Sequence, residues 1–337
     1  MTEPKVPSPL LRRIMAAERA LIVSHEEPDG DCIASSIALA SALSRRGVEA
    51  RQFNVGPFDR GEIVQYADRF ESEIPHALRE PNGHTAVIVL DCSTEERIGK
   101  IGEQIAGLPV YVIDHHASGG SFGDERWVVP ESPSTTYLVQ LLIEAMDLTP
   151  TRSEAELLMY GFATDTGFFR HLMPRQGFAF LALARLADYG VAPRTAHDWM
   201  YGGRTLASRR LIGTLLERLR VYHGGRLLAT WETLEDTEAV GKENRDSDAF
   251  YQLVFAVAEC EALIYLRQES PERCTGSLRS RDRVDVRSIA ERFGGGGHRN
   301  AAGFLAEGTY DRILPRVVEA FDEAFADGPT AAHADSR

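Results

Sequence analysis

Three adjacent residues, Asp114, His115 and His116, combine a carboxyl group with two imidazoles and could bind a metal ion or transfer a proton. They follow the apolar run 110–113, whose β-branched and aromatic residues are typical of a buried strand. The run 117–120 contains turn-forming residues, so the three groups are expected where a strand opens into a loop. Open α/β sheets bind ligands at that position. Taken alone, however, a surface loop with chance polar residues explains the triplet equally well.

A second group of polar residues follows another apolar run, 20–23, which has the character of a short strand. His25, Asp29 and Asp31 lie in a loop before a predicted helix, 32–46. In an extended segment Asp29 and Asp31 share a face, and with His25 they form a plausible ligand set for a divalent metal ion. The alternative is that Asp31 caps the helix that follows it. That alternative accounts for Asp31 but for neither His25 nor Asp29.

Two further acids follow predicted regular elements. Asp91 comes directly after the run 85–90, a predicted buried strand, and is either a helix-capping acid or a site residue. Asp165 lies in a short polar break after a predicted helix, 153–163. For Asp165, an ordinary loop at the end of the helix is a reasonable alternative.

The three apolar runs bring their polar residues together if they are neighbouring strands of a parallel sheet, because the carboxyl ends of such strands converge. Asp165 could then complete the cluster. Carboxylates and imidazoles suit Mn²⁺ or Mg²⁺, and so many like charges repel one another unless cations are present. Two ions about 3.5–4 Å apart could activate a water molecule and hold a phosphoryl group. The pattern therefore predicts phosphoesterase chemistry.

The order of the predicted elements favours an α/β fold with two domains. Strands in the first part are expected at 20–23, 48–55, 85–90 and 110–113 and alternate with helices, which is typical of a parallel sheet with flanking helices. The helices of this part are expected at 32–46, 98–105, 134–146 and 153–163, followed by a series of helices over 175–221. From about residue 224 a smaller α/β domain is expected, with strands at 227–231, 262–266 and 274–278 and helices at 248–257, 285–293 and 310–326.

Four consecutive glycines, 294–297, precede His298 and Arg299 near the end of the chain. A run of glycines is costly to order, and ordering it is worthwhile where backbone N–H groups wrap an anion. His298 and Arg299 would add donors, so this stretch predicts phosphate or oligoanion binding. A flexible linker is the alternative. The lysine and hydroxyl residue of a P-loop are missing, and the spacing does not fit a dinucleotide fingerprint.

The composition limits the possible partners. The chain has 337 residues, 43% of them hydrophobic, and a formal net charge of −13. That charge argues against an extended surface for long nucleic acid, although it allows a small anion in a local basic pocket. Neither a signal peptide nor an apolar run of the roughly 18 residues that span a membrane is evident, so a cytoplasmic protein is expected. The four cysteines are Cys32, Cys92, Cys260 and Cys274, and no pair of them has the Cys-x-x-Cys spacing. Cys32 and Cys92 each follow an acid of the predicted site, and buried packing roles are expected for these two.

Taken together, these motifs make the sequence similar to the DHH phosphoesterase family, in the branch with a DHH-associated C-terminal domain and of the nano-RNase type. Five stretches between about residues 20 and 305 carry the resemblance: SHEEPDGDCIASS, VIVLDCS, YVIDHH, FATDTGFFR and SLRSRDRVDVRSIAERFGGGGHRNAAGF. Each is modest alone, but the five in this order are specific. The implied organisation is a DHH catalytic domain at 1–205, a helical connector at 206–223, a DHH-associated substrate-binding domain at 224–327 and a disordered tail at 328–337.

The resemblance also implies roles for individual residues. One metal ion would be held by His25, Asp29 and Asp91, and a second by Asp31, Asp91, His115 and Asp165, with Asp91 bridging. His116 would face the scissile phosphate, and Asp114 would orient a histidine. The distal phosphate or terminal nucleotide would be bound by Arg279, Ser280, Gly295, Gly296, Gly297 and His298.

The activity implied by the resemblance is hydrolysis by water that two divalent cations activate. The cations are expected to be Mn²⁺, with Mg²⁺ or Co²⁺ as alternatives. The substrates would be short oligoribonucleotides, released as mononucleotides, and 3′-phosphoadenosine 5′-phosphate (pAp), converted to AMP. Long duplex nucleic acid and membranes are not expected partners, and a homodimer is possible. The alternatives are a phosphodiesterase for linear or cyclic dinucleotides, a polyphosphate or pyrophosphate hydrolase, and a regulator that binds nucleotides without catalysis.

Overall fold

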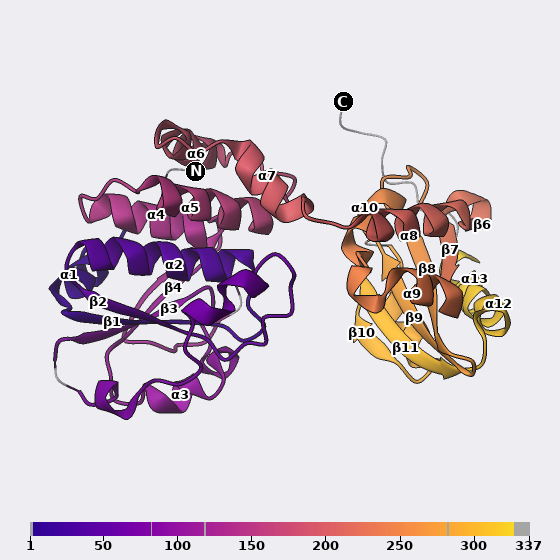
Figure 1. The fold of residues 1–337 in the computed structure, drawn as a ribbon, viewed down its shortest axis with the longest axis horizontal. Coiled ribbons are helices and arrows are strands. Elements are labelled where there is room, and N and C mark those ends of the chain that lie inside the picture. The colour runs from indigo at the N-terminus through magenta and orange to yellow at the C-terminus, as the bar shows by residue number, and fades with distance from the viewer. Residues whose placement is uncertain (1–2, 82, 118, 282, 327–337) are drawn as a thin grey trace. The chain divides into compact units, whose positions relative to one another are not determined.

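The computed structural model describes residues 3–81, 83–117, 119–281 and 283–326 (Figure 1). The chain divides into two compact units, residues 1–203 and residues 204–337. The predicted disordered tail, 328–337, lies outside the described residues. In the part of the chain that is described, no helix has both the length and the apolar character needed to cross a membrane.

Unit 1 is built on a parallel sheet of five strands in the order β2-β1-β3-β4-β5, which confirms the predicted fold class. The strands are β1 Arg19–Ser24, β2 Glu49–Phe53, β3 Thr85–Leu90, β4 Val110–Asp114 and β5 Glu125–Val128. The helices are α1 Ser8–Ala16, α2 Gly30–Arg45, α3 Ile101–Gln104, α4 Thr135–Ala145, α5 Arg152–Asp165, α6 Gly177–Asp188 and α7 Pro193–Tyr201. Short 3-10 turns occupy Val64–Arg69, His76–Leu78 and Glu95–Ile98.

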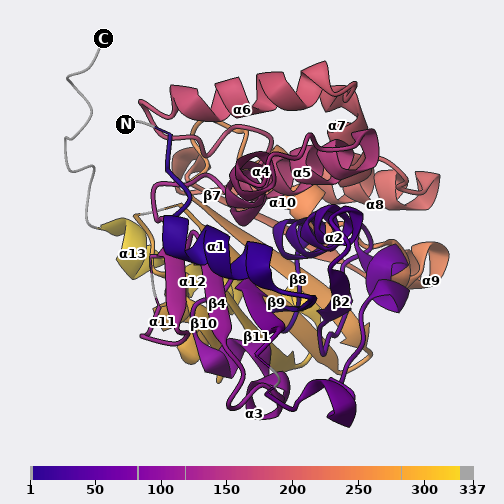
Figure 2. The ribbon, with the colours of Figure 1, turned by 90° about the vertical axis from the view of Figure 1, so that its left-hand side faces the viewer.

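Apolar residues on both faces of this sheet explain why helices cover it. All six residues of β3 are buried, as expected of a strand in the interior of a parallel sheet. Figure 2 shows α2, α4 and α5 on one face of the sheet and α3 on the other, and each face has its own cluster of buried apolar side chains. The helix expected at 98–105 is shorter than predicted. Ile98 belongs to the 3-10 turn Glu95–Ile98, and α3 is a single turn, Ile101–Gln104.

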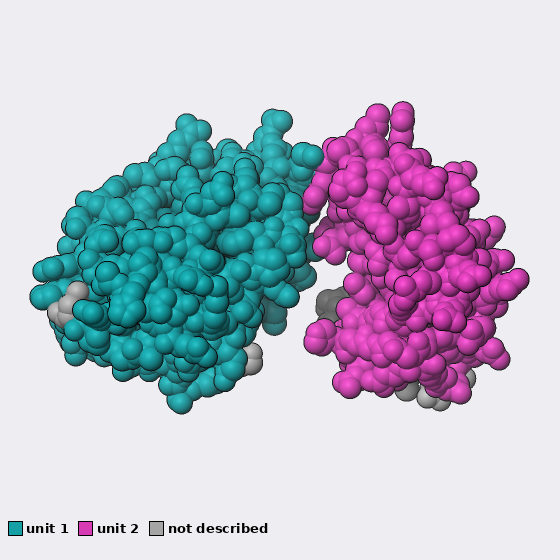
Figure 3. All heavy atoms as spheres, turned by 60° about the horizontal axis from the view of Figure 1, so that its bottom comes forward, with its two compact units in different colours: residues 1–203 teal, residues 204–337 magenta. Residues whose placement is uncertain are grey.

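Unit 2, magenta in Figure 3, contains a mixed sheet of six strands in the order β10-β11-β9-β8-β7-β6. Its strands are β6 Arg220–Tyr222, β7 Leu227–Glu232, β8 Ala262–Ser270, β9 Arg273–Ser280, β10 Gly296–His298 and β11 Ala301–Glu307. Its helices are α8 Leu206–Glu217, α9 Leu234–Val240, α10 Ser247–Val254, α11 Val286–Glu291, α12 Tyr310–Ala320 and α13 Asp322–Ala326, with 3-10 turns at His223–Gly225 and Lys242–Asn244.

Two features of unit 2 differ from the expectation. The segment 206–223 forms α8 and β6, and Leu211 and Leu215 of α8 are buried against β7 and α10. Because this helix shares the core of unit 2, it belongs to that unit and is not a separate connector. The glycine run, for which no strand was expected, continues into strand β10, which pairs antiparallel with β11.

Close helix packing in unit 1 gives a test of the fold. A Cβ atom placed on Gly161 in α5 would lie 2.4 Å from Cγ2 of Thr136 in α4 and 3.0 Å from Cβ of Ala34 in α2. We therefore expect Gly161→Ala to lower the free energy of unfolding by about 1–3 kcal/mol, as overpacking does. Urea denaturation followed by circular dichroism measures the change.

The matched control is Gly213 in α8, where an added Cβ would meet nothing within 4 Å except the backbone of its own helix and its chain neighbours. Since alanine favours a helix over glycine by about 1 kcal/mol, Gly213→Ala should stabilise unit 2. If Gly161→Ala also stabilised the protein, the inferred close contact between α2, α4 and α5 would be wrong.

Candidate metal centre

The register of the sheet places three of the predicted residues side by side. Ser24 pairs with Leu90, and Leu90 pairs with Ile113. The next residues along these strands are His25, Asp91 and Asp114, which therefore meet at the carboxyl edge of the sheet. Asp91 has a positive φ of 63°, a conformation that aspartate tolerates better than most residues. The turn begins immediately after β3 and leaves the Asp91 side chain at the strand end.

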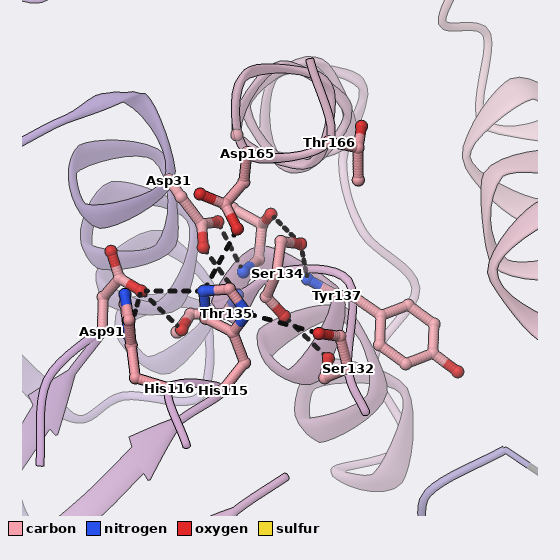
Figure 4. Close-up of polar contacts among 12 residues, drawn as sticks. Asp31, Asp91, His115, His116, Ser132, Ser134, Thr135, Tyr137, Asp165 and Thr166 are labelled. Atoms are coloured by element: carbon pink, nitrogen blue, oxygen red, sulfur yellow. Dashed lines mark hydrogen bonds and ion pairs between the residues drawn. The ribbon is translucent and has the colours of Figure 1, made fainter. Parts of the chain in front are cut away.

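Asp91 is the centre of the cluster. Its Oδ2 lies 3.4 Å from Nε2 of His25, and its Oδ1 lies 3.7 Å from Nε2 of His115 and 3.8 Å from Nδ1 of His116. Oδ1 also accepts a hydrogen bond of 2.9 Å from the hydroxyl of Thr135. Figure 4 shows Asp31, Asp91, Asp165 and both histidines of the motif around one space.

Asp31 has a different structural role from the one considered in the sequence. Asp29, not Asp31, caps α2, because its side chain accepts a hydrogen bond of 3.0 Å from the backbone N–H of Cys32. Asp31 lies in the first turn of α2 and accepts from the backbone N–H groups of Thr135 (2.6 Å) and Thr136 (2.8 Å). These residues begin α4, so the N-terminus of α4 stabilises the buried Asp31 carboxylate.

The histidine rings are oriented for ligation. Nδ1 of His115 is 3.3 Å from the carbonyl oxygen of Ser132, and Nδ1 of His25 is 2.7 Å from that of Glu26. A proton on each Nδ1 donated to these carbonyls leaves Nε2 with a lone pair, the usual arrangement of metal-binding histidines. Nε2 of His115 is buried without a hydrogen-bond partner and lies 3.1 Å from Oδ2 of Asp165. These imidazole and carboxylate donors, with an orphaned buried nitrogen among them, fit a divalent metal ion.

Asp114 contacts the second histidine of the motif. Its Oδ1 is 2.8 Å from Nδ1 of His116 and accepts from the backbone N–H groups of His115 and His116. Burial works against the charged form of Asp114, but these hydrogen bonds hold its pKa below its usual value. The hydrogen bond to Asp114 in turn raises the pKa of His116.

Asp29, the remaining predicted ligand, is not among the closely spaced ligand atoms. Among the described residues there are three groups in which every ligand atom lies within 4.8 Å of the others. The first is His25, Cys32 and Asp91, the second is Asp91, His115 and His116, and the third is Asp31, His115 and Asp165. Asp29 is in none of them, although its charge raises the pKa of Asp165. Cys32 and Thr135 are contacts that the motif did not indicate. All four cysteines are buried and unpaired, and burial raises the pKa of the Cys32 thiol to about 11, so it keeps its proton.

In unit 2, two of the predicted substrate-binding residues lie in one row of the sheet. Arg279 pairs with Ala301, and Ala301 pairs with His298, so Arg279 and His298 face the same side. Ser280 faces the other side, and its hydroxyl donates to the carbonyl oxygen of Val284 at 2.6 Å.

The glycines of the run are required by close packing. A Cβ on Gly295 would lie 2.1 Å from the carbonyl oxygen of Gly303, and one on Gly297 would lie 2.6 Å from that of Ala301. Gly297 also has a φ of +142°, which favours glycine. Gly296, in contrast, has open space around it. Packing against β11 thus explains two of these glycines without a ligand.

An α/β sheet with carboxylates and imidazoles gathered at its carboxyl edge defines a protein with a candidate divalent metal centre. This chain belongs to the DHH family: residues 19–162 match the DHH family N-terminal domain, and residues 245–327 match the DHHA1 domain. It is 32% identical to the bifunctional oligoribonuclease and PAP phosphatase NrnA of Thermus thermophilus over 90% of this chain and 89% of that protein.

More distant relatives share parts of this organisation. The chain is 24% identical to the cyclic-di-AMP phosphodiesterase PdeA of Listeria monocytogenes over 92% of this chain but 48% of that protein. An exopolyphosphatase-related protein from Bacteroides fragilis has a similar fold, with a TM-score of 0.74 and 22% identity over 97% of this chain and all of that one. The exonuclease RecJ bound to manganese is similar in fold with a TM-score of 0.52 and 16% identity, over 97% of each chain.

The crowded acids predict an unusual pH dependence for the metal-free protein. Burial raises the pKa of Asp31 to about 7, with a contribution from the charge of Asp165. Burial likewise raises the pKa of Asp165 to about 7, helped by the charge of Asp29. The pKa of an aspartate in an unfolded chain is about 3.9. Between that pH and the folded-state pKa of about 7, the folded state therefore binds more protons than the unfolded state. Stability should therefore fall as the pH rises through this window.

Chemical denaturation of EDTA-treated protein at about pH 5 and about pH 8 measures this, with a loss of about 1 kcal/mol or more per carboxylate expected. Asp165→Asn should reduce the loss, and added Mn²⁺ should abolish it in the wild-type protein. Equal stability of the metal-free wild type at both pH values would show that the acids are not confined as described.

Proposed function

We propose that this chain is a metal-dependent phosphoesterase that hydrolyses short oligoribonucleotides to mononucleotides and pAp to AMP. The observation that carries the proposal is the Asp91 carboxylate, whose two oxygens lie within 3.8 Å of imidazole nitrogens of His25, His115 and His116. A carboxylate with imidazoles near both oxygens is suited to bridge two divalent ions.

The residues that would hold the two ions come from the ends of three strands, β1, β3 and β4, and from helices α2 and α5 or the residue before α2. His25, Asp29 and Asp91 are proposed for one ion, and Asp31, Asp91, His115 and Asp165 for the other. When bound, such ions make a water molecule more acidic and neutralise charge on phosphate oxygens. Mn²⁺ is the proposed metal, with Mg²⁺ or Co²⁺ as alternatives, because hard carboxylates and borderline imidazoles suit all three.

His116 is proposed to give a proton to the leaving oxygen. Its Nδ1 is fixed by Asp114 at 2.8 Å, so its other nitrogen, Nε2, is available for the substrate. The raised pKa keeps the ring protonated to higher pH, as a general acid requires. The ring is also more exposed than that of His115, with 37% of the His116 side chain accessible against 15%. Asp114 acts as a positioning residue, since its own carboxylate is buried.

The choice of substrate rests on the similarity to the bifunctional oligoribonuclease and PAP phosphatase along nearly the whole chain. Arg279 and His298, on one face of the unit 2 sheet, are proposed to bind a phosphate that is not cleaved, together with the N–H groups of residues 296 and 297. Two other predicted contacts are not part of this proposal, because Ser280 faces the other side of the sheet and the N–H of Gly295 donates to the carbonyl oxygen of Ala290. Linear or cyclic dinucleotides and pyrophosphate or polyphosphate remain alternative substrates of the same chemistry. A cytoplasmic location and a homodimer stay predictions.

The proposal is tested by supplying Mn²⁺ and, separately, an RNA dinucleotide, a long RNA, pAp and pyrophosphate. Rapid release of mononucleotides from the dinucleotide and of AMP from pAp is expected, with slower attack on the long RNA. Turnover of pyrophosphate alone would refute the substrate assignment. Failure to cleave any of them despite bound metal would favour a regulator that binds nucleotides.

Two substitutions separate metal binding from proton transfer. Asp91→Ala should abolish the activity and also reduce the metal content, measured by elemental analysis, because Asp91 is the shared ligand. His116→Ala should keep the metal and lower kcat by about 10²–10⁴-fold, the usual effect of removing a general acid. If His116→Ala lost the metal as completely as Asp91→Ala, His116 would be a ligand and its proposed role would be wrong.

A further inference from the structure

One side of the unit 2 sheet is only partly covered. The cluster of buried apolar side chains on that side includes residues of β7 and β8, with Leu263 and Tyr265, and helices α8 and α10. Beyond β8 the same side continues over β9, β11 and β10 with small residues, since Tyr265 pairs with Ser277 and Ser277 pairs with Gly303. In the described structure this part of the sheet therefore carries mostly small residues, with Leu305 half exposed at 51%.

Two arginines lie on this uncovered side. Ser277 pairs with Tyr265, and Arg279 is two residues after Ser277 in β9, so all three side chains are on the same side of the sheet. Arg267 is two residues after Tyr265 in β8 and faces the same way. We propose that Arg267, with the hydroxyl of Ser277, forms a second phosphate-binding position beside the one built on Arg279. The two positions would bind two different phosphates of the substrate, neither of them the phosphate that is cleaved. This inference rests on the proposed function and specifies the length of the preferred RNA.

Arg267 is held in place but not neutralised. One of its terminal nitrogens, Nη2, donates to the hydroxyl of Ser277 at 3.0 Å, and the guanidinium lies 5.2 Å from the ring centroid of Tyr265. Its Nε is buried without a hydrogen-bond partner. An unsatisfied N–H of a cation is costly, and a phosphate oxygen would satisfy it with the paired geometry that a guanidinium offers.

The nearby acids are already paired with other cations. Arg245 binds the buried Glu232 at 2.7 Å and Glu269 at 3.4 Å, and Lys242 also binds Glu269. Among the residues that the structure describes, Arg267 forms no ion pair. Burial works against the charged form of Glu269, and the charges of Lys242, Arg245 and Arg267 together lower its pKa. Arg267 thus shares this acid with two other cations and keeps part of its charge for an anion from solution.

The two arginines are parts of one rigid assembly. Arg279 lies over the ring of Tyr251 at 4.8 Å, as Arg267 lies over Tyr265. The two tyrosine rings pack edge to face with their centroids 6.3 Å apart. The hydroxyl of Tyr265 donates to Glu232, which Arg245 also binds. Arginines fixed on packed rings lose little side-chain entropy when they bind an anion, which favours recognition.

The spacing of the arginines suits two phosphates rather than one. Arg279 is opposite Leu263, which precedes Arg267 by four residues along β8. Four residues of a strand extend about 13 Å. The intervening row holds Ser277, which is buried, and Gly303, which is partly buried, so no bulky side chain stands between the two arginines.

The test compares 5′-phosphorylated adenylate dimers and trimers as substrates of the full chain with Mn²⁺. Once one internucleotide bond is cleaved, a dimer has one uncleaved phosphate and a trimer has two. Initial rates give kcat and KM for each. We expect Arg267→Ala to raise KM for the trimer about tenfold or more, the effect of losing a charge-assisted contact, while KM for the dimer and both kcat values change less than about twofold. Arg279→Ala should raise KM for both substrates.

Arg312→Ala is the matched control, because it removes an exposed arginine from α12, which packs on the opposite side of the sheet. Arg267→Lys should retain part of the trimer affinity. Circular dichroism and thermal unfolding of Arg267→Ala, compared with the wild type, detect misfolding separately. Equal effects on dimer and trimer, or none on either, would overturn the inference while the proposed function stands. Failure of the wild type to cleave both RNAs would instead refute the proposed function.

Discussion

The structure of unit 1 depends on confining several carboxylates in one buried space. Asp31 and Asp91 are 1% exposed, and unpaired charges at such positions are strongly unfavourable. Their partners are supplied by neighbouring elements. The first backbone N–H groups of α4 bind Asp31, and the hydroxyl of Thr135 binds Asp91. These contacts do not remove the mutual repulsion of the acids. Cations bound at this edge of the sheet would therefore stabilise unit 1.

Close packing of the helices over the sheet sets the geometry of that space. A Cβ on Gly30 would lie 2.7 Å from the side chain of Thr164, so the start of α2 touches the end of α5. This contact brings Asp31 and Asp165, each one residue further along, into the same region. At the other end of α5, Glu154 binds Ser41 and Arg45 of α2. The relative position of two proposed ligands from distant parts of the sequence is thus fixed by a glycine and by polar contacts far from the site.

The strand ends of the site could be predicted from local sequence, because each buried strand is a continuous apolar run that stops at a polar residue. The parallel sheet and the convergence of His25, Asp91 and Asp114 followed from that pattern. Contacts made across the fold were not predictable in this way. The pairing of Asp31 with α4 depends on tertiary packing, and Thr135 carries no local signal of its contact with Asp91. Strand β5 was missed because only Trp127 in it is buried, and β10 and β11 were missed because glycine and alanine indicate turns or helices more often than strands.

Unit 2 uses buried charge in a different way from unit 1. Glu232 is fully buried but is compensated within the protein by Arg245, Thr237 and Tyr265. A carboxylate satisfied in this manner needs no cation from solution, and it fixes the tyrosine on which Arg267 lies. In unit 1 the protein leaves negative charge uncompensated, and in unit 2 it leaves positive charge uncompensated on a rigid surface. Unit 1 is therefore suited to bind cations, and the arginines of unit 2 are suited to bind anions.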